Sequence, residues 1–150
     1  MSVKISVTGN KEIDRILAEM PKVVQHQALG AAHLDAAKPM IEREKSLVPR
    51  RTGELQNSIG GIKTPMKRAG AVGEVIIGPR RSRKNRGHHG VLVEKGTKKR
   101  QTRKGANRGV MPAQPFVEPA FTGTKDTVIG RIAVSVGRKM LSVMRRYAKK

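Results

Sequence analysis

The first hydrophobic residues of the chain alternate with polar ones, and later ones recur at helical spacing. Val3, Ile5 and Val7 alternate with Lys and Ser before a Gly-Asn pair, which predicts a short half-buried strand that ends in a turn. Apolar side chains then recur three or four residues apart over residues 13–20, and Pro21 follows where a helix should end. The pattern therefore predicts an opening strand and a short helix.

A longer helical pattern runs from Lys22 to Ser46, where Ala, Leu, Lys, Glu and Gln are frequent and the apolar residues form one stripe. Pro39 lies inside it, and a proline there removes one backbone hydrogen bond and clashes with the preceding turn. We expect a long helix with a kink near Ala36, and two separate helices are the alternative. Glu42 and Glu44 stand beside basic residues, which is typical of a solvated helix end.

Three further segments have the short apolar patterns of strands: Leu55–Ile62, Val72–Ile77 and Gly90–Glu94. A basic loop containing glycine separates the first two. In the third, Val91 and Val93 are expected on one face, because side chains alternate along a strand. These strands should pair antiparallel, and the strand at residues 3–7 is a candidate to join them.

The segment Lys125–Ala148 has the strongest helical periodicity in the chain. Its apolar residues recur at spacings of three and four, at Ile129, Ile132, Ala133, Val136, Met140, Val143, Met144 and Tyr147. Together the patterns predict an α+β fold, in which a small antiparallel sheet of three or four strands packs against a long helix and a C-terminal helix. We expect one domain, residues 1–150, with long basic loops.

The composition predicts a small aliphatic core. Hydrophobic residues make up 37% of the chain and aromatic residues 2%, whereas roughly 45–50% of an average globular protein is apolar. We therefore expect neighbouring subunits to complete the core. The absence of cysteine excludes disulfides, thiolate zinc sites and thiol nucleophiles. No apolar run reaches the length of about 20 residues that spans a membrane, and residues 1–7 lack a signal-peptide layout, so we expect a soluble, cytosolic chain without a membrane partner.

The formal net charge of +21 is concentrated in residues 79–109, where twelve residues are Lys or Arg and one, Glu94, is acidic. Such a segment cannot bury enough apolar surface to fold alone, so we expect mobile loops around a short strand. Its cations suit the phosphates of duplex DNA or an acidic neighbour, and no aromatic residue between Ile59 and Phe116 offers base stacking. The candidate DNA- or partner-facing residues are Arg80, Arg81, Arg83, Lys84, Arg86, Lys98, Lys99, Arg100, Arg103, Lys104 and Arg108.

Other candidate chemistry is weak. His88 and His89 are adjacent and would point to opposite faces of a strand, so they cannot readily chelate one metal ion. His26 and His33 are seven residues apart, share a helix face, and are expected to be packed or exposed instead of metal ligands. The glycines at 70–73 lack the Lys-Ser or Lys-Thr of a phosphate-binding loop. We therefore expect no enzymatic activity, no metal and no cofactor.

Three short motifs occur in order along the chain: Leu47–Ile59 (LVPRRTGELQNSI), Val93–Thr97 (VEKGT) and Pro112–Phe121 (PAQPFVEPAF). Their order and spacing resemble those of a family of phage tail-component proteins, also called neck or tail-completion proteins, over about residues 13–147. The basic residues at 80–86 and after Thr97 depart from the family pattern. The resemblance marks as structural positions Pro49, Thr52, Gly53, Leu55, Ile59, Gly96, Thr97, Pro115, Phe116 and Pro119.

The motifs also have a local physical interpretation. Pro49 and Gly53 should end the long helix and reverse the chain, while Thr52 hydrogen-bonds within the turn. The prolines at 112, 115 and 119 should stiffen an extended approach to the last helix. Phe116 is expected in the core, and the role of Phe121 is left open.

The resemblance implies a subunit of a homo-oligomeric ring in the virion, assembled in the host cytoplasm. Such a ring lies in the neck of a long-tailed phage and joins head to tail around the DNA channel. The implied partners are adjacent head-completion, connector and tail proteins, and the genome DNA that passes through. A tail terminator that caps the tail tube is the alternative in the same region. A host nucleic-acid-binding protein of ribosomal or nucleoid type is supported by the charge but by none of the motifs.

Overall fold

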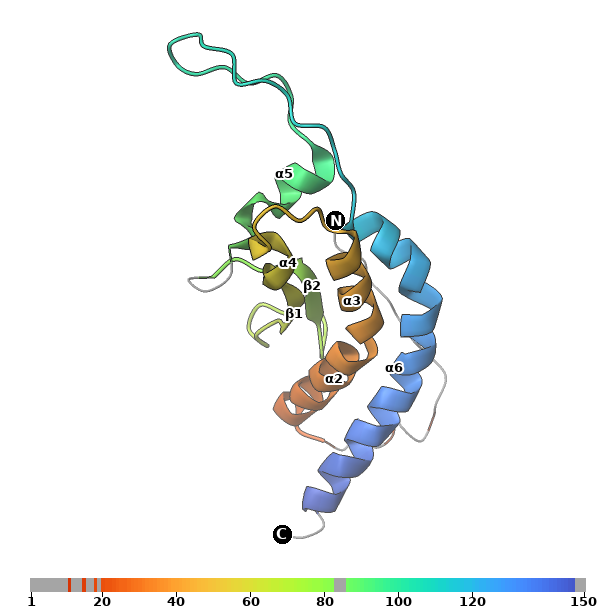
Figure 1. The fold of residues 1–150 in the computed structure, drawn as a ribbon. Helices are drawn as coiled ribbons and strands as arrows, with labels where there is room; N and C mark the ends of the chain where they lie inside the picture. Colours follow the sequence, from red (N-terminus) through yellow and green to blue (C-terminus); the bar gives the residue numbers. More distant parts are fainter. Residues whose placement is uncertain (1–10, 12–14, 16–17, 19, 83–85, 148–150) are drawn as a thin grey trace. The chain divides into compact units, whose positions relative to one another are not determined.

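The computed structural model describes residues 11, 15, 18, 20–82 and 86–147. The strand expected at residues 3–7 and most of the helix expected at 13–20 lie outside them. The elements in chain order (Figure 1) are α2 (Lys22–Ala36), α3 (Lys38–Leu47), α4 (Glu54–Ser58), β1 (Ile59–Lys63), β2 (Val75–Pro79), the 3₁₀-helix η1 (Gly87–His89), α5 (Gly90–Lys95) and α6 (Val117–Tyr147).

The chain divides into two compact units. Unit 1 comprises residues 1–39, 61–77 and 125–150, and unit 2 comprises residues 40–60 and 78–124. Long elements such as α6 contribute residues to both units. The single domain expected from the sequence stays a prediction.

The long helix expected from Lys22 to Ser46 is two helices, which was the alternative. α2 ends at Ala36 and α3 begins at Lys38, so the break falls one residue after the expected kink. The Ala37 amide still donates to the carbonyl of His33 at 2.9 Å. Pro39 occupies the first turn of α3, where its missing N–H removes no intrahelical hydrogen bond.

The sheet of the described residues has two strands, β1 and β2, which pair antiparallel. Their register is set by hydrogen bonds at both ends, from the Thr64 amide to the Glu74 carbonyl and from the Arg80 amide to the Ser58 carbonyl, each 3.0 Å. The fold is therefore α+β with a long C-terminal helix. The strand expected from Leu55 begins only at Ile59, because the preceding residues form the short helix α4.

The strand expected at Gly90–Glu94 is wrong, because these residues form α5. Val93 is 5% exposed and Val91 is 65% exposed, so the two side chains do not share a face. Five residues with one apolar alternation are too few to distinguish a strand from a single helical turn. Gly90 also lies so close to Pro79 that a Cβ atom would come within 2.7 Å of its ring.

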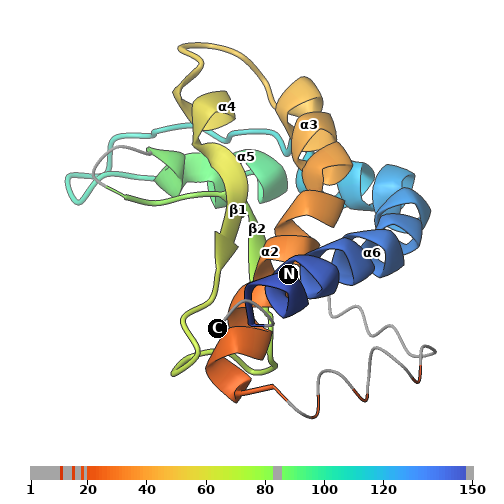
Figure 2. The ribbon, with the colours of Figure 1, turned by 90° about the horizontal axis from the view of Figure 1, so that it is seen from below.

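Unit 1 contains α2 and the C-terminal part of α6, which lie side by side (Figures 1 and 2). The Ser135 hydroxyl donates to the Asp35 carboxylate at 3.2 Å and ties the two helices together. Small residues dominate the buried side of α2, which permits a close approach. The buried residues are His26, Ala28, Gly30, Ala32 and Ala36 on α2 and Val128, Ile132, Ser135, Val136 and Met140 on α6.

The C-terminal helix was predicted in type but not in its start. α6 begins at Val117, eight residues before Lys125. Pro119 lies in its first turn, so the expectation of an extended chain there is wrong, although a proline is tolerated where no intrahelical N–H is needed. Ile129 and Ala133 are exposed, and Val128 and Ser135 are buried instead.

Candidate functional site

The three motif segments meet in the core of unit 2. Leu55 and Ile59 from the first, Val93 from the second and Phe116 from the third form one buried cluster with Val48. Phe116 is completely buried, as expected, and is the largest side chain in the cluster. All ten positions that the resemblance marks as structural lie in unit 2.

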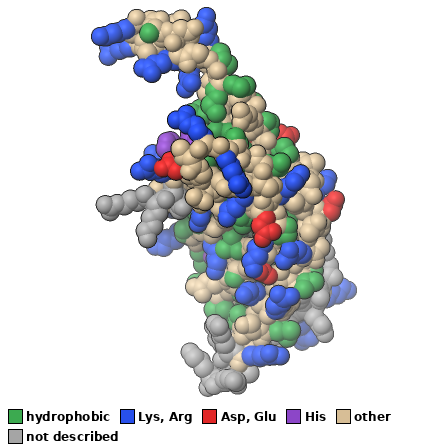
Figure 3. Space-filling model, viewed as in Figure 1, with side chains coloured by type: hydrophobic (Ala, Val, Ile, Leu, Met, Phe, Trp, Pro, Cys, Tyr) green, Lys and Arg blue, Asp and Glu red, His purple; other side chains and the backbone are tan. Residues whose placement is uncertain are grey.

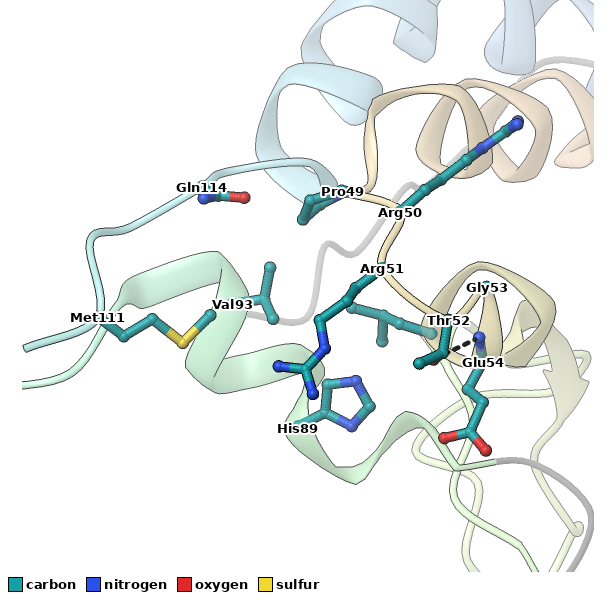
Figure 4. A pocket seen from close by; sticks show the side chains of 11 residues that line it. Pro49, Arg50, Arg51, Thr52, Gly53, Glu54, His89, Val93, Met111 and Gln114 are labelled. Atoms are coloured by element: carbon teal, nitrogen blue, oxygen red, sulfur yellow. Dashed lines mark hydrogen bonds between the residues drawn. The ribbon is translucent and has the colours of Figure 1, made fainter. Parts of the chain in front are cut away.

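The turn of the first motif is built as its sequence suggests. Gly53 has a φ of 76°, a left-handed conformation that favours glycine, and it precedes the first residue of α4. The Glu54 amide donates to the Thr52 hydroxyl at 3.4 Å (Figure 4). The local hydrogen bond expected of Thr52 is therefore confirmed.

A surface pocket of about 520 Å³ in unit 2 is lined by the same turn, residues 49–55, together with His89, Val93, Met111 and Gln114. Figure 4 shows the Arg51 side chain beside the His89 ring, whereas the Arg50 side chain points away. All three motif segments or their immediate neighbours thus contribute to one concave surface.

Glu94 of the second motif caps the beginning of α6. Its carboxylate accepts hydrogen bonds from the backbone amides of Phe116 at 2.8 Å, Val117 at 3.0 Å and Glu118 at 3.2 Å. These amides have no intrahelical acceptor, and a negative charge is favourable at a helix N-terminus. Sequence reasoning counted Glu94 only as the single acid of a basic region. Its place in the VEKGT motif was the available signal.

Glu44 on α3 contradicts the solvated helix end expected from its basic neighbours. It is fully buried, and neither carboxylate oxygen has a hydrogen-bond partner among the described residues. Burial raises the pKa of Glu44 to about 7, and the nearby charge of Glu94 adds to the rise. Glu44 does not line the pocket.

The basic bend, residues 80–86, belongs to unit 2, and both of its described ends are bonded to residues 54–58 of the same unit. The Arg80 guanidinium donates from Nε to the Ser58 carbonyl at 3.1 Å. It covers Gly60, where a Cβ atom would lie 2.9 Å from the guanidinium. The Arg86 guanidinium forms an ion pair with Glu54 at 3.1 Å. Arg81 is exposed, and Arg83 and Lys84 lie outside the described residues.

Residues 97–111 form a second basic feature, which we name the hairpin arm (Figure 1). At its base the Thr97 amide donates to the Met111 carbonyl at 2.9 Å, and the Met111 amide returns a hydrogen bond to the Thr97 hydroxyl at 3.0 Å. Gly96 has a φ of 68°, and a Cβ atom there would come within 2.7 Å of the Met111 carbonyl oxygen. Glycine and threonine of the second motif therefore fix where the arm begins.

The arm is hydrogen-bonded to its tip. Gln101 pairs with Asn107, and the Thr102 amide and hydroxyl bond the carbonyl and amide of Ala106 at 2.8 and 3.0 Å. On the face seen in Figure 3, the arm shows Lys and Arg side chains and no acidic ones. Its exposed cations are Lys98, Lys99, Arg100, Arg103, Lys104 and Arg108. A hydrogen-bonded hairpin thus presents these charges.

The histidines have structural partners. His26 and His33 share a face of α2, as expected, and both bind Gly73: its amide donates to His26 Nδ1 at 3.0 Å, and its carbonyl lies 2.8 Å from His33 Nδ1. Since Nδ1 of His26 is an acceptor, its Nε2 donates to the Thr64 carbonyl at 2.7 Å. His88 and His89 lie in η1, not on a strand, with their rings 5.2 Å apart at their centroids.

Within the described part of the chain, no group of three or more His, Cys, Asp or Glu residues could hold a metal ion. Among the same residues, no helix combines the length and the apolar character needed to cross a membrane. Compared with protein-family models, with curated proteins and with solved structures, the chain matches none.

Proposed function

We propose that this chain is a structural, non-catalytic subunit of the neck of a long-tailed phage, in a ring that joins head to tail around the DNA channel. The observation that carries the proposal is the meeting of the three motifs. Segments up to about 70 residues apart in the sequence share one buried cluster, and Glu94 of the second motif caps the helix that follows the third. A motif set whose members depend on one another structurally is what a shared fold would require.

Assembly into a ring is supported by an apolar surface that unit 1 leaves uncovered. On α6, Ile129, Val134 and Leu141 are 42%, 61% and 57% exposed. Gly130 and Gly137 lie among them, and a Cβ atom at either position would meet nothing within 4 Å. Glycine in a helix interior costs about 1 kcal/mol relative to alanine, and no close contact within the described chain explains it. In the proposed ring a neighbouring copy covers this face.

The net charge opposes assembly of the isolated chain. Each subunit adds +21, and like charges repel unless counterions or anionic partners are present. The proposal therefore places the ring in the virion, beside head-completion, connector and tail proteins and the passing genome. We also propose that residues 3–7 form a third strand of the sheet that contains β1 and β2.

Native mass spectrometry of the purified chain, alone and with the connector and tail proteins encoded beside its gene, tests the assembly. We expect a closed ring with the partners present. Val134→Glu should reduce the ring fraction, because it introduces a charge into the uncovered face. Val23→Glu makes the same change at an exposed position of α2 and should not reduce it. A stable monomer in the presence of the partners would contradict the proposal.

The hairpin arm favours a second candidate of another class, a host nucleic-acid-binding protein. Gene neighbours separate the two, because a portal, capsid or major tail gene supports the neck and a ribosomal operon supports the host protein. A virion reconstruction distinguishes a neck ring from a tail terminator, since the terminator would cap the tail tube instead of lying above it.

A further inference from the structure

The hairpin arm places like charges directly opposite each other. The Arg108 amide donates to the Arg100 carbonyl at 2.7 Å, and the Arg100 amide donates to the Gly109 carbonyl at 3.2 Å, so Arg100 and Arg108 face each other across the hairpin. Like charges at such a position destabilise a hairpin. Residues 97–111 contain no acid that could neutralise them. No negative charge within the arm therefore offsets the repulsion between these two arginines.

The register also gathers most of the cations on one side. Side chains alternate along a strand, so Lys98, Arg100 and Arg108 share a face and Lys99 lies on the other. Arg103 and Lys104 occupy the tip, in the turn closed by Thr102. Five of the six cations thus lie along one face and its end.

These cations are available, unlike Arg80 and Arg86 of the basic bend. None of the six has a hydrogen-bond or ion-pair acceptor among the described residues. In the bend, Arg80 is bound to the Ser58 carbonyl and Arg86 to Glu54. A guanidinium already committed to the protein must break those contacts before it can bind a phosphate.

The dimensions of the arm fit a DNA strand. From Lys98 to Arg103 the extended chain spans about 17 Å at roughly 3.3 Å per residue. Over that distance one strand of duplex DNA carries about five phosphates, at one per 3.4 Å of helix axis. The arm has no aromatic side chain for base stacking, which disfavours a single-stranded ligand. A ladder with fixed spacing also matches a regular row of phosphates better than a flexible acidic peptide.

We propose that the hairpin arm binds the sugar-phosphate backbone of duplex DNA, without reading its sequence, and that Arg80 and Arg86 hold the fold instead of contacting DNA. The inference rests on the proposed function for the presence of a duplex beside the chain. Neutralisation of the opposed arginines by phosphate is the source of the favourable energy, as is the release of counterions from the DNA.

The test measures binding of the purified full chain to two duplexes of unrelated sequence by fluorescence anisotropy, over a series of salt concentrations. The arm variant combines Lys98→Gln, Arg100→Gln and Arg108→Gln. Its control combines Lys22→Gln, Lys67→Gln and Arg68→Gln, three exposed cations of unit 1, and loses the same charge. We expect the arm variant to lower the slope of log affinity against log salt by about 2.7, at about 0.9 per phosphate contact. The control should change it by less than about one.

A second readout is the thermal stability of the arm variant without DNA. Removal of the opposed arginines should leave the melting temperature unchanged or raise it, so loss of binding cannot be attributed to unfolding. Arg80→Gln should lower the melting temperature, because it removes the hydrogen bond to Ser58, and should leave the salt slope of the folded protein unchanged.

Two results would overturn the inference. Equal changes in slope for the arm variant and its control would show that only the total charge matters. Loss of binding to poly-glutamate by the arm variant, with duplex binding intact, would assign the arm to an acidic protein. These outcomes are independent of the neck proposal, because absence of the chain from virions would refute the neck and leave the DNA result standing.

Discussion

His26 in unit 1 and Glu44 in unit 2 are both buried ionisable residues, but they differ in their hydrogen bonding. In unit 1, His26 has a hydrogen-bond partner at each ring nitrogen, and these bonds fix the loop that carries Gly73. In unit 2, Glu44 is fully buried with no partner among the described residues. Unit 2 also carries the three motifs and the opposed arginines of the hairpin arm. The hydrogen bonds of His26 therefore stabilise unit 1, whereas the burial of an unpaired carboxyl group at Glu44 weakens unit 2.

The substitution with the largest expected effect should destabilise unit 2 and leave unit 1 folded. Phe116→Ala removes the largest side chain of the unit 2 cluster and should cost about 3–5 kcal/mol. Amide hydrogen exchange gives a probe in each unit: the Gln114 amide, bonded to the Val93 carbonyl in unit 2, and the Gly73 amide, bonded to His26 in unit 1. We expect exchange at Gln114 to accelerate and exchange at Gly73 to stay slow.

The matched control is Phe121→Ala, whose aromatic ring is only half-buried on α6 and which should cost much less. Equal acceleration at Gln114 and Gly73 in the Phe116 variant would show that both units unfold as one cooperative structure. In that case the two units would share one stability.

The elements that sequence predicted well are those with long patterns. The periodicity of α6 extends over many turns, so its type was clear. Its start was misplaced because Pro119 was taken as part of an extended approach instead of a first-turn residue. The alternation of Val91 and Val93 covers a single turn, and tertiary packing of Val93 decided in favour of a helix. Short patterns are decided by contacts that the sequence does not display.

In the candidate site, too, some features follow from the sequence and others depend on contacts in space. That the cations of residues 98–108 are exposed follows from composition alone, and the motif turn at Thr52 and Gly53 follows from turn chemistry. The cap formed by Glu94 and the burial of Glu44 depend on which segments meet in space. Arg80 has the same charge as Arg100, yet only the structure distinguishes a bound guanidinium from a free one.

The second largest effect is a pH dependence located in unit 2. Burial raises the pKa of Glu44 from an ordinary value of 4.5 to about 7. The folded state therefore holds a proton that the unfolded state releases, and stability is lost as the pH rises from about 4.5 to about 7. A shift of this size corresponds to about 3 kcal/mol, since one pKa unit is about 1.4 kcal/mol. Glu44→Gln should remove most of this loss.

Denaturant unfolding at pH 4.5 and pH 8 measures this loss of stability. The Glu44→Gln variant should resemble the unmodified chain at pH 4.5 and exceed its stability at pH 8. Glu42→Gln, two residues earlier on the exposed side of α3, is the control and should change neither value appreciably. A Glu44 variant that is less stable than the unmodified chain at pH 8 would mean that the carboxylate has a favourable partner, and the contrast with His26 would disappear.

A smaller effect is expected when unit 1 loses one of its buried partners. His26→Ala leaves the Gly73 amide and the Thr64 carbonyl without their hydrogen bonds, which should cost about 2 kcal/mol at roughly 1 kcal/mol for each bond. His33→Ala removes one bond to the same glycine and should cost about half as much. Denaturant unfolding of both variants checks the ratio. Equal losses would assign the stability to packing instead of to the paired nitrogens.

The smallest effect concerns the charged contacts at the edge of unit 1. The hydrogen bond with Lys38 at 2.6 Å lowers the pKa of Asp35, and the Ser135 hydroxyl and the Arg138 charge lower it further against a small cost of burial. Stability from this carboxylate is present above its ordinary pKa and is lost as the pH falls through the lowered value. Because the pair is exposed to solvent, Asp35→Asn should lower the melting temperature at pH 7 by only about 1–2 °C. Asp126 is exposed on α6, and Asp126→Asn should not change the melting temperature measurably. If Asp35→Asn lowered the stability as much as His26→Ala does, charged surface contacts would contribute as much to unit 1 as the buried histidine.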